Sequence, residues 1–506
     1  MWRRIRSPIL FPAASKKLEL LKFSLLLLFI QCFLFVLFVA FGAYSLRADA
    51  SSPGNSITPV FGGFNHARFN IVARFQPMFQ DIHVMVFIGF GFLMVFLKRY
   101  GYSSLGFNYL LAALSLQWSI LCQGFFELND DYKIEIGMTS LYRADIATAT
   151  VLISMGAVLG RVSHIQLIVM SILEIAAYSV NYVLNEKYFK AVDVGGSILV
   201  HTFGAYFGLS VSYILGRQQK CLYVDFDLSV NLHKPTYTSN ILAMIGTLFL
   251  WVYWPSFNSI DLENDRAHRA VINTYLALAA SCVIAFAASQ LSSKEHTFNM
   301  VHVQNSTLAG GVAIGACAHL MVQPFGALLI GMIAGFLSVY GYNTVSFFLK
   351  RRLAIEDTCG VHNLHGIPGA FGGITAILLA YIATEQQYGK TLYQVYQARA
   401  SPEISPNTEY IVLETGDGRT ASQQAGYQTL LLVVTILMAT VSGLISGFIV
   451  SLRWWGDASP ETFYEDSVFW ELPSEQQDVQ DHPPPTWKLK EKLYNNSNVN
   501  MSVVCM

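Results

Sequence analysis

Charged residues are scarce in this sequence. Only 13% of its 506 residues are Asp, Glu, Lys or Arg, whereas soluble domains carry about 25%, and 53% are hydrophobic. The 32 basic and 33 acidic residues leave a formal net charge of −1. This composition argues against a soluble domain, a disordered chain and a nucleic-acid-binding protein. It predicts a membrane protein with several spans.

The sequence also lacks the motifs of most metal and catalytic sites. Its seven cysteines are scattered and include no CxxC or zinc-type spacing. There is no phosphate-binding loop, and no nucleophile and base lie at a catalytic spacing. We therefore expect no disulfide framework, no metal, no cofactor and no enzymatic activity.

Long apolar runs recur along the chain instead. Each is close to the roughly 20 residues that an α-helix needs to cross a membrane. The sequence therefore predicts an all-α integral membrane protein with twelve transmembrane helices. The predicted spans are residues 23–46, 79–97, 105–126, 140–160, 164–183, 193–215, 236–255, 270–291, 299–319, 324–349, 359–384 and 427–452.

The charges between the runs predict how the chain is oriented. If the basic N-terminus is cytoplasmic, every second connection should lie inside and carry Lys or Arg. The opposite connections, at 127–133, 261–269 and 385–426, are mixed or acidic. Both termini are therefore predicted to be cytoplasmic. The basic connections carry Lys98 and Arg99, Arg161, Arg217 and Lys220, Lys294, Lys350 to Arg352, and Arg453.

The two ends of the chain differ from its middle. The run 23–46 is longer than the about 7–15 apolar residues of a cleaved signal peptide, which is the alternative reading, and no convincing cleavage site follows it. We expect a retained first helix. The predicted organisation is a cytoplasmic tail at 1–19, a transmembrane domain at 20–453, and a largely disordered cytoplasmic tail at 454–506.

Two aspartate and histidine pairs share one spacing within the apolar runs. Asp193 precedes His201 by eight residues in DVGGSILVH, and Asp357 precedes His365 by eight residues in DTCGVHNLH. The two segments lie five spans apart, so they cross the membrane in opposite directions. This arrangement predicts an inverted five-helix repeat. At ~1.5 Å per residue each histidine lies about 12 Å deeper than its aspartate, near the midplane.

Each of these residues also has a structural reading. Two buried histidines can hydrogen-bond to each other and do no more than join two halves of a protein. An aspartate in the first turn of a helix caps backbone amides, and we favour this role for both aspartates over contact with a substrate. The other ionisable residues of the spans are assigned to helix packing: Asp145, Glu174, His302, His319 and His362.

An apolar path with two neutral imidazoles at its centre excludes ions, because desolvating a charge costs many kcal/mol. A small neutral molecule with a lone pair fits such a path. Ammonia can hydrogen-bond to an imidazole as donor or acceptor, whereas potassium cannot lose a proton to become neutral.

Four stretches carry a family resemblance. DVGGSILVHTFGAYFGLS, AMIGTLFLWVYWPSFNS, NMVHVQNSTLAGGVAIGA and DTCGVHNLHGIPGAFGG resemble the animal Rh glycoproteins of the ammonium transporter superfamily. The resemblance runs from about Lys22 to the WELP at 470–473. It implies a homotrimer with one pore per subunit, ammonia, ammonium or methylammonium as substrate, and a plasma-membrane location. The residues that it implies are the pore histidines His201 and His365, the gate residues Phe257 and Ile146, and the pore-supporting residues Asp193, Asp357 and Asn258.

The sequence departs from the family pattern at several positions. The gate residue after the Ala-Asp pair is usually phenylalanine and is Ile146 here. Acids that some relatives carry in their vestibules are replaced by Tyr182, Asn240, Asn299 and Lys350, although the DLEND segment near the outer end could compensate. The segment EDSVFWELP resembles the family's cytoplasmic tail, which suggests a cytoskeletal or scaffold partner.

We therefore predict a channel or transporter that deprotonates ammonium and passes ammonia through a hydrophobic pore. Two alternatives are a carbon dioxide channel that uses the same lumen and a transport-silent structural subunit of a membrane complex. The paired histidines argue against a silent subunit, because apolar side chains would fill a purely structural site at lower cost.

Overall fold

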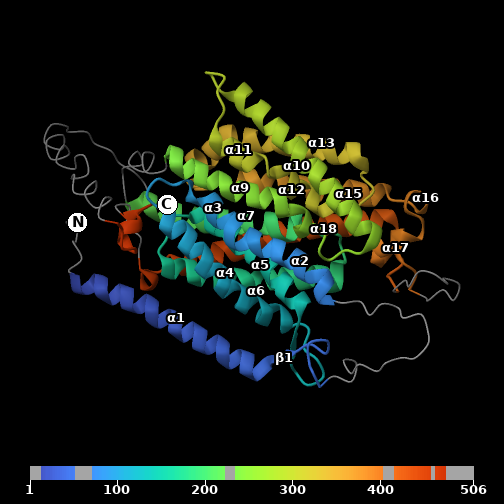
Figure 1. Ribbon diagram of the computed structural model, residues 1–506, viewed down its shortest axis with the longest axis horizontal. Helices are drawn as coiled ribbons and strands as arrows, with labels where there is room; N and C mark the ends of the chain where they lie inside the picture. Colours follow the sequence, from blue (N-terminus) through green and yellow to red (C-terminus); the bar gives the residue numbers. More distant parts are fainter. Residues whose placement is uncertain (1–12, 52–70, 223–233, 403–414, 457–461, 474–506) are drawn as a thin grey trace, which may run out of the picture.

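The computed structural model describes residues 13–51, 71–222, 234–402, 415–456 and 462–473, and helices dominate it (Figure 1). Within these ranges eleven helices are long and apolar enough to cross a membrane. The main helices of these spans are α1 (Ala13–Phe41), α2 (Ile71–Val84) continued by α3 (Phe90–Leu93), α4 (Gly101–Gly124), α5 (Met138–Val158), α6 (His164–Val183), α7 (Phe203–Leu222), α9 (Tyr237–Phe257), α10 (Asn264–Ser292), α13 (Gln323–Tyr340), α15 (Ile367–Ile382) and α18 (Ala421–Val450).

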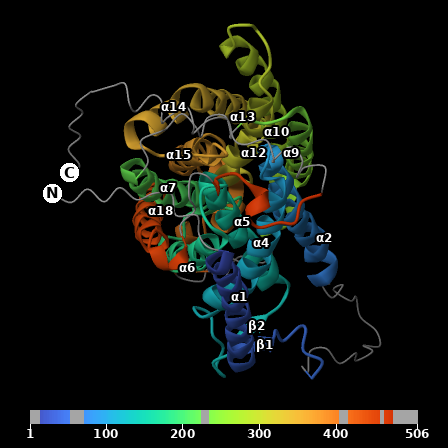
Figure 2. The same cartoon turned by 90° about the vertical axis from the view of Figure 1, so that its left-hand side faces the viewer.

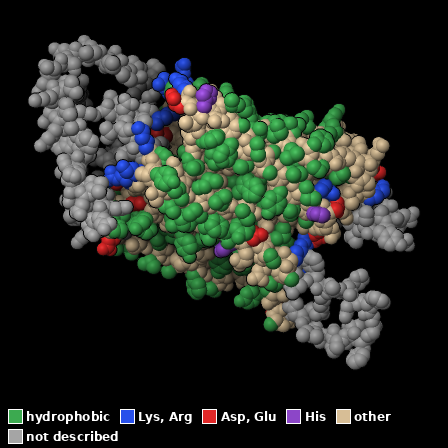
Figure 3. All heavy atoms as spheres, turned by 45° about the horizontal axis from the view of Figure 1, so that its top comes forward, with side chains coloured by type: hydrophobic (Ala, Val, Ile, Leu, Met, Phe, Trp, Pro, Cys, Tyr) green, Lys and Arg blue, Asp and Glu red, His purple; other side chains and the backbone are tan. Residues whose placement is uncertain are grey.

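The surface confirms an integral membrane protein. Hydrophobic side chains cover the middle of the face in Figure 3, whereas charged side chains gather towards its two ends. Large apolar residues such as Phe336, Leu378 and Phe448 are exposed on the long helices. Such a band is stable only against lipid or against other apolar helices. We call the end that carries Arg99, Arg161 and Lys350 the inner end, following the excess of basic residues there.

The predicted span 299–319 is not one continuous helix. It consists of α11 (Met300–Ser306), α12 (Ala309–Ile314) and a single 3-10 turn at Gly315–Cys317. Every residue of α12 is buried. Irregular backbone at membrane depth is tolerated where protein rather than lipid surrounds it. Hydropathy therefore located this segment correctly, but it could not show the interruption.

The second span begins earlier than predicted. The sequence placed its start near residue 79, after Arg74, but α2 begins at Ile71 and includes both Arg74 and Asp81. Arg74 forms an ion pair with Glu263, and the Asp81 carboxylate accepts a hydrogen bond from the Ser256 hydroxyl. Because partners from distant segments satisfy these groups, the helix can include them.

The first helix, α1, lies beside the bundle rather than within it (Figures 1 and 2). Gln31 of α1 and Gln117 of α4 exchange hydrogen bonds of 2.8 and 3.3 Å through their side-chain amides. At its outer end, α1 leads into the strand β1 (Gly42–Tyr44), which pairs in parallel with β2 (Ile134–Ile136). Polar contacts at two depths thus attach α1 to the bundle.

Short elements cover the two ends of the bundle. α14 (Ser346–Phe348) follows α13 towards the inner end, and α16 (Glu385–Tyr388) and α17 (Leu392–Val395) belong to the connection between α15 and α18. Residues 462–473, which the sequence assigns to the tail, pack on α4. The Asp466 carboxylate accepts the N–H groups of Tyr102 and Ser103 at 2.8 and 2.7 Å, and so caps α4.

Candidate functional site: a histidine pair between two cavities

The two histidines of the repeated motif lie side by side. Nδ1 of His201 is 3.1 Å from Nδ1 of His365, the ring centroids are 5.2 Å apart, and the ring planes are inclined by only 14°. At 2% and 4% exposure, both residues are buried. At this distance one ring donates and the other accepts, so the geometry suits two neutral imidazoles. The buried Nε2 of His201 has no hydrogen-bond partner within the described ranges and can bond to a small molecule.

The two segments that carry the histidines are built alike. Oδ2 of Asp193 accepts the N–H groups of Ile198 and Leu199 at 3.0 and 2.7 Å. The oxygens of Asp357 accept those of Val361 and His362, both at 2.9 Å. Each carboxylate therefore holds the first turn of the helical segment that carries a histidine of the pair.

A glycine three residues after each aspartate makes this turn possible. Gly196 and Gly360 have φ angles of +64° and +71°, in the left-handed region that side chains with a Cβ rarely adopt. A one-turn π-helix follows each glycine, at Ser197–Thr202 and at His362–Gly366. The sequence contained this signal, because both motifs have glycine at the same offset from the aspartate.

Three aromatic rings surround the histidine pair. Trp254 and Phe257 of α9 lie 5.6 and 5.8 Å from the His201 ring, and Phe90 of α3 lies 6.2 Å from the His365 ring and nearly parallel to it. The sequence analysis selected Phe257 and missed the other two. Trp254 precedes Phe257 by three residues, so both lie on one face of α9. Phe90 comes from a distant segment and has no local signal.

Cavities lie on either side of the pair. An outer cavity of about 400 Å³ is lined by Ile146, Asp193, Leu199 and Val200, among others. An inner cavity of about 240 Å³ is lined by Phe90, Asp357 and His365, among others. The two cavities share no lining residue. The structure thus places Ile146 at the outer cavity, Phe257 against His201 and His365 at the inner cavity, and His201 directly follows Val200, which lines the outer cavity.

Asn258 supports the outer half of the site. Its amide donates to the Thr274 hydroxyl at 3.1 Å and to the Gly311 carbonyl at 3.3 Å, which joins α9 to α10 and α12. Its buried Oδ1 faces the loop that begins at Asp193, since a Cβ on Gly195 would lie only 2.2 Å from it. Asn258 therefore packs closely against this loop.

The other ionisable residues of the spans have varied surroundings. Asp145 and His83 are 2.8 Å apart, Glu174 accepts the Ser154 hydroxyl, and His302 pairs with Ser289 at 3.1 Å. His319 lines the outer cavity, which the sequence did not indicate. No group of three or more His, Cys, Asp or Glu residues in the described part of the chain is arranged to hold a metal ion.

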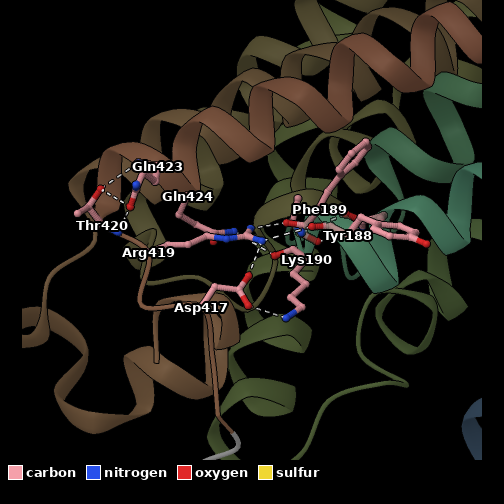
Figure 4. A network of polar contacts seen from close by, with 10 residues as sticks. Tyr188, Phe189, Lys190, Asp417, Arg419, Thr420, Gln423 and Gln424 are labelled. Carbon is pink, nitrogen blue, oxygen red and sulfur yellow. Dashed lines mark hydrogen bonds and ion pairs between the residues drawn. The ribbon is translucent and has the colours of Figure 1, made fainter. Parts of the chain in front are cut away.

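A polar network at the outer end holds the segment before Asp193 (Figure 4). The Arg419 guanidinium donates to the carbonyls of Phe189 and Tyr188, at 2.5 and 3.3 Å, and to Asp417 at 2.7 Å. Lys190 donates to the other Asp417 oxygen at 2.8 Å, and this bond lowers the pKa of the Asp417 carboxyl. The network thus supplies hydrogen-bond donors to the carbonyls at the end of the π-helical turn that follows α6. It thereby anchors the chain that leads to Asp193.

Arg419 is buried, so its replacement should be costly. We expect Arg419→Met to lower the free energy of unfolding by about 3 kcal/mol, because two part-buried carbonyls lose their donors and Asp417 loses one of its two cationic partners. Arg419→Lys should recover only part of this, since an ammonium cannot reach both carbonyls and the carboxylate at once. Thermal unfolding in detergent checks the expected order of stability, which is parent, then Arg419→Lys, then Arg419→Met. Equal melting temperatures for both variants and the parent would contradict it.

The sequence and fold match a known family. The family model described as Ammonium Transporter Family matches residues 60–461. This chain belongs to the ammonium transporter family. Ammonium transporter Rh type B of Xenopus tropicalis is 44% identical over 465 residues, covering 91% of this chain and 95% of that protein. Ammonium transporter Rh type C of Homo sapiens is 42% identical and covers 91% and 92%.

Solved structures of the family share the fold. A structure of Nitrosomonas europaea Rh50, titled as a study of conduction by Rhesus channels, is 28% identical with a TM-score of 0.64. It covers 84% of this chain and 98% of that one. A structure of Saccharomyces cerevisiae Mep2, at 18% identity, has a TM-score of 0.59 and covers 79% and 92%. Family members of this kind are transporters and channels, as the sequence analysis expected of this chain.

Two positions where this family member departs from the pattern lie near the inner end. Lys350 donates to Glu356 at 2.8 Å, and Asn299 caps α11 by accepting the Val301 N–H at 2.9 Å. Lys350 is therefore held in an ion pair at the inner end.

Proposed function

We propose that this chain is a membrane channel for ammonia and ammonium, in which ammonium loses its proton and ammonia passes between the cavities at the histidine pair. The observation that carries the proposal is the 3.1 Å contact of two buried imidazoles, of which His365 lines the inner cavity and His201 follows Val200 of the outer cavity. The relatives named as ammonium transporters support the substrate.

The surroundings of the pair explain why a neutral molecule would be selected. Trp254, Phe257 and Phe90 pack around the two rings, and in the described part of the chain neither ring contacts a carboxylate. A cation beside these rings would lose its hydration with no charged partner. Ammonia can replace its water contacts with hydrogen bonds to imidazole.

The site residues receive distinct roles in this proposal. Ammonium enters the outer cavity and releases its proton. Ammonia passes Ile146 and Phe257, bonds to His201 and His365, and is protonated again beyond the inner cavity. Asp193, Asp357 and Asn258 do not touch it; they hold the backbone that places the rings.

The proposal extends to the whole protein. We propose a homotrimer in the plasma membrane with one pore per subunit, a cytoplasmic tail at 1–19, a transmembrane domain at 20–453 and a second cytoplasmic tail at 454–506. The C-terminal tail is also proposed to bind a cytoskeletal or scaffold protein. Residues 1–12 and 474–506 of the two tails lie outside the described residues.

Stopped-flow measurement of internal pH in proteoliposomes tests the function. An inward gradient of ammonium chloride should make the vesicle interior alkaline faster than in empty vesicles. His201→Trp should return the rate to that of empty vesicles, because the larger ring fills the space beside His365. The matched control His268→Trp changes an exposed histidine and should leave the rate unchanged.

The same preparation separates the alternatives. A rate equal to that of empty vesicles for the parent chain, with the protein inserted and folded, indicates the transport-silent subunit. Faster acidification in a carbon dioxide gradient, without faster ammonia entry, indicates the carbon dioxide channel.

A further inference from the structure

We propose that Arg143 sets how strongly the outer cavity attracts ammonium, because its positive charge repels an entering cation and offsets part of the negative charge of Glu127 and Glu186. This inference rests on the proposed function and adds a residue that determines cation access. It concerns small ammonium and alkylammonium cations.

Arg143 is well placed to act on an entering cation. It belongs to α5, three residues before Ile146, so the two side chains lie on one face of the helix. Arg143 lines the outer cavity together with Ile146. It also lines a neighbouring polar cavity of about 240 Å³, whose wall includes Glu127 and Glu135. A cation that enters either cavity therefore lies near the guanidinium.

Two carboxylates hold the guanidinium. Its nitrogens lie 3.3 Å from Glu186 and 3.5 Å from Glu127, and the group lies 5.7 Å from the centre of the Tyr182 ring. The second oxygen of Glu186 is buried and has no hydrogen-bond partner among the described residues. When both acids are ionised, the guanidinium offsets one of their two negative charges.

The remaining charges of the outer cavity are already engaged. Lys190 pairs with Asp417, and Arg266 donates to the Gln394 carbonyl at 3.0 Å. Asp261 accepts the Tyr142 hydroxyl, and Asp193 caps its own helix. Besides His319, the lining carries three basic residues, Arg143, Lys190 and Arg266, and three acidic residues, Asp193, Glu186 and Asp261. Arg143 is thus the cation whose loss would free Glu186, a carboxylate that lines the cavity.

Uptake of labelled methylammonium into proteoliposomes at pH 6 tests the proposal, because nearly all of this probe is then a cation. We expect Arg143→Gln to lower KM about fivefold at low salt, the effect of one unit charge at ~8 Å in a medium of intermediate dielectric constant. The maximal rate should stay within about twofold, since the histidine pair is untouched. At about 1 M salt, screening should remove most of the difference.

Three further variants complete the test. Arg143→Lys keeps the charge and should keep the parent KM. Glu186→Gln removes a negative charge and should raise KM. This variant tests whether negative charge at the outer cavity favours the cation, without changing Arg143. Lys390→Gln removes a cation at the outer end that does not line the cavity, so its KM should equal that of the parent.

The outcomes separate the two proposals. An unchanged or higher KM in Arg143→Gln, with Lys390→Gln behaving as the parent, overturns the role of Arg143 while the channel function stands. If Arg143→Gln does not fold, an unchanged or lower KM in Glu186→Gln overturns it instead. No uptake by the parent chain above empty vesicles contradicts the channel function itself.

Discussion

Gly195→Ala should prevent this protein from reaching its folded state. A Cβ on Gly195 would lie 2.2 Å from Oδ1 of Asn258 and 2.6 Å from Cα of Gly315. The second contact is with backbone, which cannot move aside, and the Gly195 N–H already bonds to the Gly315 carbonyl at 3.0 Å. We expect a loss of more than about 4 kcal/mol of stability. Yield and monodispersity in detergent, followed by thermal unfolding, measure it.

Gly426→Ala is the matched control. Gly426 lies in α18, and a Cβ there would meet nothing within 4 Å. Alanine also favours the helix by about 0.5–1 kcal/mol relative to glycine. The control should therefore be neutral or slightly stabilising. If Gly195→Ala had the same melting temperature as the parent, the close approach of the Asp193 loop to Gly315 would not be required for stability.

Asp193→Ala should lower ammonia permeability at least about tenfold. The carboxylate holds the N–H groups of Ile198 and Leu199, which shape the turn before His201. Hydrogen bonds to a charged group contribute about 1.5–3 kcal/mol each, and about 1.4 kcal/mol already corresponds to a factor of ten in population. Loss of both bonds should displace the His201 ring from His365. Internal alkalinisation in proteoliposomes measures the effect.

The repeat supplies a second test of the same mechanism. Asp357→Ala should have an effect of similar size, because Asp357 caps the segment that leads to His365 in the same way. Asp265→Ala is the control, since Asp265 is half exposed and forms an ion pair with Arg269 on its own helix, away from both histidine segments. A parent-like rate in either capping variant would show that the carboxylate is not needed to place its histidine.

Much of the fold could be predicted because membrane depth imposes a simple rule on local sequence. Every spanning helix needs an apolar run, and charges mark the ends. The predicted ends were wrong where distant partners satisfy a charge, as for Arg74 and Asp81 of α2. The break between α11 and α12 was also missed, since hydropathy does not distinguish a buried span from one that faces lipid.

The candidate site divides in the same way. The equal spacing of Asp193 with His201 and of Asp357 with His365 was sufficient to predict two opposed half-structures that meet near the midplane. The rise of an α-helix per residue is constant, and the number of spans between the two segments gives their crossing directions. Tertiary packing alone decided which groups surround the pair and the outer cavity. Phe90, Trp254 and Arg143 come from three different helices, and only the way these helices pack determines which side chains reach the histidines and which charges meet at the entrance.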